Sequence, residues 1–267
     1  MASSLPREYL VQARQMIARV CVYEPVDLQA VAAARELAQL EPDRAAFIVG
    51  ALLELSRTGG RKEIVTIDAV GRAILSAPPE QLSHLHRSRI LDAAHDNGLA
   101  AVAALFISPD PVLSLDADVR PRQDPAIAHM TLGHKKMLAR TADPDLLARL
   151  AAEADPRVVR NILVNPRLTE AIVVRICARR PIRGEVLRLV HENRNWSTRE
   201  KVREAIVQNP YCEPELALKL LPTLSQGMLR LIARNQTLHT SLRGAAARLV
   251  EGEFAPVDVA DEESELS

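Results

Sequence analysis

The feature that most constrains the fold of this chain is a pattern repeated around four asparagines in its C-terminal half. An apolar residue stands seven and three positions before each asparagine, and another stands three positions after it. Positions −7 and −3 lie on one face of a helix, so each copy predicts a helix that ends near its asparagine. The four asparagines are Asn165, Asn193, Asn209 and Asn235.

Each asparagine is expected to end its helix, because Asn tolerates the left-handed backbone conformation that follows many helix C-termini. Shortly after the +3 apolar residue, Thr169, Thr198 and Thr240 are expected to cap the next helix. Alternate asparagines are 44 and 42 residues apart. A helical period of roughly 40–47 residues is typical of HEAT and armadillo repeats. Residues 128–250 are therefore predicted to form a short α-solenoid.

The segment from Ala142 to Arg160, continued by Asn165-Pro-Arg-Leu-Thr169, resembles the bacterial leucine-rich repeat variant, a relative of the HEAT-like solenoids. Repeats of that family read as a short helix, an Asp-Pro, a Val-Arg helix and then Asn-Pro-x-Thr. The resemblance covers about residues 138–250 and implies stacked short helices and an interaction role. The family includes a member with a cysteine-ligated iron–sulfur cluster, but this chain has no matching cysteine group.

Residues 1–107 are predicted to form an N-terminal helical bundle, which assigns the whole chain to the all-α class. Aromatic residues make up only 3% of the sequence, and helix formers such as Ala, Leu, Arg and Glu dominate it. Within this region Thr66 is expected to cap a helix that runs to Ser76. Proline and aspartate alternate over residues 108–127, which predicts a linker. Residues 251–267 are predicted to be a disordered acidic tail.

The net charge of zero conceals an uneven distribution along the sequence. Residues 1–129 carry 13 Lys/Arg and 16 Asp/Glu, residues 130–250 carry 21 and 11, and residues 251–267 carry none and 7. The predicted repeat region therefore has a charge of +10 and directly precedes the acidic tail. Two roles for the tail are open at this point: transient pairing with the basic region, or solubility alone.

An arginine stands five positions before three of the four asparagines, at Arg160, Arg188 and Arg230. In the remaining copy Glu204 takes this place, with Arg203 beside it. Stacked repeats would place these arginines along one surface. Two interpretations are open: solvated side chains near helix C-termini, where positive charge is favourable, or a stripe that binds anions or an acidic partner.

No motif in the sequence dictates a chemistry, so the chain is predicted not to be an enzyme and to hold no metal and no cofactor. Cys21, Cys177 and Cys212 are far apart and odd in number, which favours buried apolar side chains over a disulfide framework or paired metal ligands. His84 and His86 are two positions apart and would point to different faces of a helix.

The sequence begins without a secretory signal, and no apolar run approaches ~18 residues, so a cytoplasmic protein without membrane contact is expected. Two functions suit a basic helical repeat. The first is a non-catalytic protein–protein interaction scaffold or regulatory adaptor, with a partner that has an acidic surface. The alternative is a HEAT-like nucleic-acid-binding module, although the scarcity of aromatics argues against stacking on single-stranded bases.

We expect the purified protein to contain neither a stoichiometric metal nor a cofactor, because its cysteines and histidines lack ligand spacing. Elemental analysis of material purified without chelators checks this expectation. Stoichiometric zinc or iron would contradict it.

Overall fold

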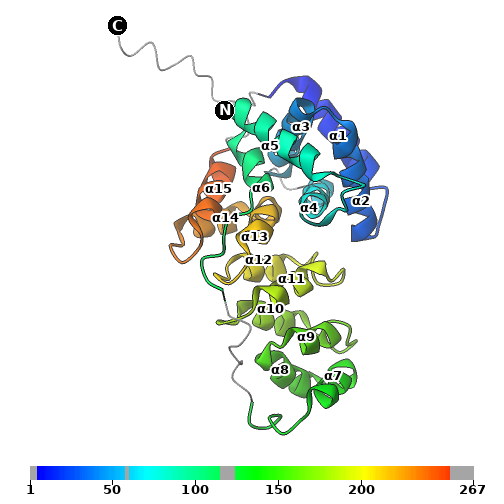
Figure 1. Ribbon diagram of the computed structural model, residues 1–267, viewed down its shortest axis with the longest axis vertical. Helices are drawn as coiled ribbons and strands as arrows, with labels where there is room; N and C mark the ends of the chain where they lie inside the picture. The colour runs from blue at the N-terminus through cyan, green and yellow to red at the C-terminus, as the bar shows by residue number, and fades with distance from the viewer. Residues whose placement is uncertain (1–4, 58–59, 115–123, 253–267) are drawn as a thin grey trace. The chain divides into compact units, whose positions relative to one another are not determined.

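The computed structural model describes residues 5–57, 60–114 and 124–252, and every regular element in these ranges is a helix (Figure 1). The predicted all-α class is therefore confirmed. The described residues group into two units by their mutual contacts. Unit 1 holds those within Met1–Pro109, Leu218–Asn235 and Thr240–Ser267, and unit 2 holds those within Asp110–Ala217 and Gln236–His239.

This division differs from the predicted one, which placed residues 1–107 and 128–250 in separate domains. The last helices of the chain belong with the N-terminal helices instead. Residues 107–114 and 124–131 contain no helix, in keeping with a linker, whereas residues 115–123 lie outside the described ranges. Of the predicted acidic tail, Glu251 ends the last helix, and residues 253–267 lie outside the described ranges.

Unit 1 is assembled around a helix that is buried almost all around. The elements of the unit are α1 (Arg7–Val20), α2 (Val26–Gln39), α3 (Pro42–Arg57), α4 (Arg61–Ser76), α5 (His84–Asp96), α6 (Ala100–Phe106), η1 (Leu221–Thr223), α14 (Gln226–Arg234) and α15 (Thr240–Glu251). The middle of α3 is apolar on every face, so it contacts α1, α4, α5 and α6 at once. At its outer edge, Tyr9 of α1 stacks on Phe47 of α3 with ring centroids 4.8 Å apart.

The C-terminal segment packs on this core, which explains why the chain does not divide at the linker. Helix α15 contacts α6, and η1 contacts α3 and α4. A Cβ added to Gly71 of α4 would lie 3.1 Å from the backbone oxygen of Lys219, so glycine permits the close approach of the two segments. Arg57, at the end of α3, donates from Nη2 to the carbonyl of Val250 at 2.8 Å.

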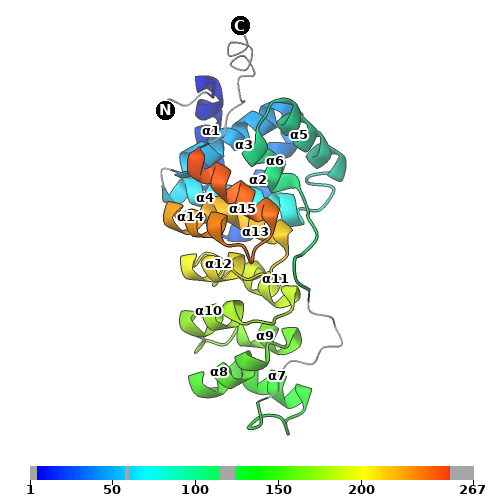
Figure 2. The same ribbon diagram turned by 90° about the vertical axis from the view of Figure 1, so that its left-hand side faces the viewer.

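Unit 2 consists of short helices arranged in two layers. The helices are α7 (Leu132–Thr141), α8 (Pro144–Glu153), α9 (Pro156–Ile162), α10 (Glu170–Ala178), α11 (Gly184–Glu192), α12 (Glu200–Val207) and the first residues of α13 (Pro214–Leu220). In one layer α9 packs between α7 and α11, and in the other α10 packs between α8 and α12 (Figure 2). The apolar positions of the sequence pattern face inward: Val158, Val186, Val202, Ile162, Val190 and Ile206 are all at most 1% exposed.

Two of these helices begin at an Asp-Pro pair. Asp143 accepts a hydrogen bond from the backbone N–H of Leu146, and Asp155 accepts one from the N–H of Arg157, both at 2.9 Å. The proline that follows each aspartate needs no hydrogen-bond partner in the first turn. The Asp-Pro pairs therefore set where α8 and α9 start.

The pattern asparagines of unit 2 join neighbouring helices of one layer. Asn165, which follows α9, donates from Nδ2 to the carbonyls of Ala139 (3.0 Å) and Ala142 (3.3 Å) at the end of α7. Asn209, which follows α12, donates to Cys177 (2.7 Å) and Arg179 (2.9 Å) at the end of α10.

Asn193, which follows α11, donates to Leu163 at the end of α9 at 3.5 Å. In all three cases the acceptors include the residue that caps the earlier helix. The last carbonyls of a helix lack intrahelical partners, so each asparagine supplies a donor to one or two of them across the stack. At Leu163 the indole Nε1 of Trp196 is a second donor, at 3.3 Å.

The prediction that these asparagines adopt the left-handed conformation is wrong. Asn193 and Asn235 have φ of −77° and −81°, and among the described non-glycine residues only Ala154 has a positive φ. In Asn165, Asn193 and Asn209, Oδ1 accepts the N–H of the residue two positions on, which fixes the local turn.

The predicted period of 42–44 residues is also wrong. Helices α7, α9 and α11 begin 24 and 28 residues apart, and α8, α10 and α12 begin 26 and 30 residues apart. The longer period paired Asn165 with Asn209, which follow helices of different layers. It also paired Asn193 with Asn235, which belong to different units.

The predicted threonine caps do not form. Thr169 precedes α10 but makes no capping hydrogen bond, Thr198 lies before the N-cap residue Arg199, and Thr240 is already helical. Thr66 lies within α4, where its hydroxyl donates to the carbonyl of Lys62 at 2.8 Å. Threonine has a local hydrogen-bonding alternative inside helices, so a threonine alone does not mark a start.

We expect Asn209→Ala to lower the free energy of unfolding by about 2–3 kcal/mol, because buried carbonyls lose a donor and the turn loses an acceptor. Urea unfolding followed by circular dichroism measures this. The matched control is Asn195→Ala, since Asn195 is exposed and contributes only its backbone N–H to the same kind of turn. Equal effects of the two substitutions would contradict the bridging role.

Candidate functional site

Helices α7 and α9 form a basic groove on the surface of unit 2. The groove has a volume of about 500 Å³ and is lined by Lys136, Met137 and Arg140 of α7 and by Arg157, Arg160 and Asn161 of α9. Four of these six side chains are cationic and none is a carboxylate. The groove is therefore a concentrated positive surface within one pair of neighbouring helices.

Two of the four cations are held in place by polar neighbours. Arg140 donates from Nε to Oδ1 of Asn161 at 2.8 Å, and Asn161 itself donates to the carbonyl of Arg157 at 2.9 Å. Arg157 pairs with Asp155 at 2.8 Å, and this hydrogen bond holds the pKa of the Asp155 carboxyl below its usual value. These contacts fix the guanidinium groups of Arg140 and Arg157.

The other two cations, Lys136 and Arg160, have no ion-pair partner among the described residues. Arg160 is exposed and Lys136 is half-buried, so both can reach a ligand in the groove. An anion that entered between them would meet two unpaired cations beside two oriented guanidinium groups.

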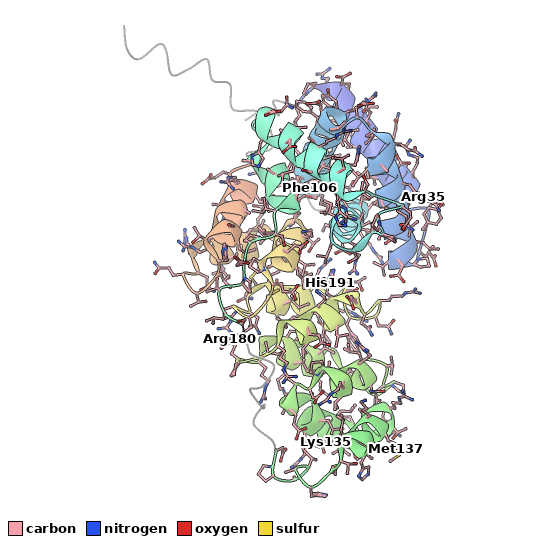
Figure 3. The ribbon with its side chains drawn as sticks, viewed as in Figure 1. Arg35, Phe106, Lys135, Met137, Arg180 and His191 are labelled. Atoms are coloured by element: carbon pink, nitrogen blue, oxygen red, sulfur yellow. The ribbon has the colours of Figure 1, made fainter. Side chains whose placement is uncertain are left out.

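Helical geometry separates Lys136 from the lysine that precedes it. Lys135 is buried, and its Nζ contacts both carboxylate oxygens of Glu153 at 2.8 Å, which ties α7 to α8. The next residue is turned by about 100° around the helix and therefore lines the groove. Met137 is 60% exposed and adds an apolar surface at the same site (Figure 3).

The structure separates the members of the predicted arginine stripe. Arg160 of α9 and Arg188 of α11 lie on adjacent helices of one layer, whereas Arg203 is buried on α12 of the other layer. Arg188 is occupied by Glu213, and this hydrogen bond raises the pKa of the Arg188 guanidinium. Arg230 belongs to unit 1. Of the four, only Arg160 lines the groove.

Lys136, Arg140 and Arg157 were not predicted as site residues because they lie outside the asparagine pattern. Lys136 and Arg140 are four positions apart on α7, and Arg157 and Arg160 are three apart on α9. Residues at these spacings share a helix face. The two basic pairs, one on α7 and one on α9, were the signal that could have identified the groove.

Residues that could ligate a metal do not gather in the described ranges: no group of three or more His, Cys, Asp or Glu side chains is placed to hold an ion. In the same ranges we find no helix with the length and apolar character needed to cross a membrane.

Comparison of the chain with protein-family models, with curated proteins and with solved structures gives no match. The resemblance to the leucine-rich repeat variant therefore stays a prediction that rests on the residues alone. The fold and the site together define an all-helical protein with a basic groove on a two-layered helical unit.

We expect Cys177 and Cys212 to resist alkylation in the native protein. Burial raises the pKa of Cys177 to about 12 and also raises that of Cys212, so both stay protonated thiols well above neutral pH. Iodoacetamide at about pH 8 should label only the partly exposed Cys21, as read by mass spectrometry. In denaturant all three should react, and equal native rates would contradict the burial.

Proposed function

We propose that this protein is a non-catalytic interaction module that binds an acidic segment of a partner protein in the α7/α9 groove. The observation that carries the proposal is the groove lining, with four cations, no carboxylate, and unpaired Lys136 and Arg160. Clustered like charges repel one another, so an anionic partner relieves a cost that the free protein bears.

The character of the groove supports a protein partner. Arginine and methionine are enriched at protein–protein interfaces, and both line this groove. We interpret the two layers of unit 2 as a short solenoid, a fold that typically binds partners along extended surfaces. Cytoplasmic location stays an expectation from the sequence.

A nucleic-acid function is the second candidate because the basic charge is not confined to unit 2. Residues 130–217 carry 16 Lys/Arg and 11 Asp/Glu, whereas residues 218–250 carry five and none. Contacts to phosphates need only such positive charge. We favour the protein partner because the groove spans only two short helices and includes the exposed Met137, an apolar residue typical of protein interfaces.

We expect the double variant Lys136→Glu/Arg160→Glu to bind a fluorescent peptide of about ten glutamates roughly tenfold more weakly than the wild type at low salt. The reason is that two unpaired attractive charges become repulsive. Fluorescence anisotropy at about 25 and 150 mM salt measures the affinity, which should fall as the salt screens the charges.

The controls use residues of the same unit. Arg167→Glu makes the same change at an exposed arginine outside the groove and should have little effect. Asp155→Asn keeps a good helix cap but frees Arg157 from its carboxylate, so it should tighten binding about twofold. Weakening by Arg167→Glu equal to that of the double variant would contradict a groove site. If the wild type binds duplex DNA but not the glutamate peptide, the second candidate, a nucleic-acid function, is favoured.

A further inference from the structure

A second pocket lies on the other layer of unit 2, between α8 and α10, and combines an apolar floor with a basic rim. Its volume is about 370 Å³. The floor includes Ile172 and Ile176 of α10 and alanines of α8, and the rim carries Arg175, Arg179 and Arg180. None of these residues lines the α7/α9 groove.

The pocket exists because α8 presents small side chains where larger ones would fill the space. Ala148, Ala151 and Ala152 lie three and four positions apart, which places them on one face of α8. Opposite them, Ile172 and Ile176 are 5% and 2% exposed and form a firm apolar surface. An aliphatic side chain that enters the pocket therefore contacts carbon on both helices.

The charge of the rim indicates what kind of partner segment could place an aliphatic side chain in the pocket. Arg175 lies in the last turn of α10 and Arg179 directly follows the helix, and neither has an ion-pair partner among the described residues. Both line the same pocket, so a nearby anion would meet two cations that have no carboxylate partner. Arg180 is occupied, since it donates to the carbonyl of Gln208 at 2.6 Å; Figure 3 labels it at the end of α10.

We propose that the α8/α10 pocket is a second docking site, which takes one aliphatic side chain from an acidic segment of a protein partner. The aliphatic side chain packs between the α8 alanines and the α10 isoleucines. Carboxylates that flank it pair with Arg175 and Arg179. Each element of the occupant thus matches a feature of the pocket in charge and polarity.

The test uses the full chain and two fluorescent peptides that differ at one central residue. Both carry Asp and Glu on either side, and the centre is Leu in one and Ser in the other. We expect the wild type to bind the Leu peptide at least about fivefold more tightly, because burial of an aliphatic side chain is favourable. The ratio between the peptides should persist at about 500 mM salt, where charge attraction alone is screened.

Two substitutions with matched controls assign the effect to the pocket. Ala152→Leu fills the pocket from an exposed position and should abolish the Leu preference, whereas Ala171→Leu, exposed on α10 outside the pocket, should leave it unchanged. Arg175→Glu should weaken both peptides alike at low salt, and Arg167→Glu should not. We expect the double variant Lys136→Glu/Arg160→Glu to keep the preference for the Leu peptide. That result would show that the preference does not depend on the α7/α9 groove.

Two results would overturn the proposal that the α8/α10 pocket takes an aliphatic side chain of an acidic segment. The absence of a Leu preference in the wild type, or its persistence in Ala152→Leu, would overturn the proposal even if the α7/α9 groove binds acidic peptide. Binding of octanoate that depends on Ala152 and Arg175, without a Leu preference among the peptides, would also overturn it. That result would assign the pocket to free aliphatic acids.

Discussion

The stacking of unit 2 depends on a hydrogen bond from a side-chain amide to the end of a neighbouring helix. A helix of seven to ten residues has few internal hydrogen bonds, and four carbonyls at its end lack intrahelical partners. Burying such an end in a stack would leave those carbonyls unsatisfied. Asn165, Asn193 and Asn209 supply donors from the next helix of the same layer to one or two carbonyls at the ends of α7, α9 and α10.

An asparagine can do this because its amide has two functions at once. The oxygen accepts an N–H two positions on and holds the turn, while the nitrogen donates across the stack. Aspartate lacks the donor, and serine and threonine reach less far. The residue type thus follows from the need for one donor and one acceptor on a short, rigid side chain.

The sequence could reveal the helices because the pattern that defines them is local. Apolar residues four apart share a helix face, so the burial of Val186 and Val190 could be predicted from positions in one turn. The partners of the asparagines could not be predicted, since Asn209 reaches carbonyls 30 and 32 residues earlier. Those distances depend on loop lengths that vary from one helix pair to the next.

The candidate site was less predictable for the same reason. The groove joins Lys136 of α7 with Arg160 of α9, and only the layering places these helices side by side. Of the residues that line the groove, the sequence pattern predicts only Arg160, as one member of the arginine stripe. Of the other members, Arg188 pairs with Glu213, Arg203 is buried on the second layer, and Arg230 belongs to unit 1.

Short helices also determine how such a protein can recognise a partner. Each helix has one row of inward residues that it needs for packing, as Lys135 shows by its buried pair with Glu153. Only a few outward positions remain on a helix of this length, so no single helix can present a whole binding surface. The surface must be composed across neighbouring helices of a layer, and each layer composes its own. In the two proposed docking sites, substitutions at outward positions such as Lys136 or Arg175 would then change recognition while the inward contacts keep the fold.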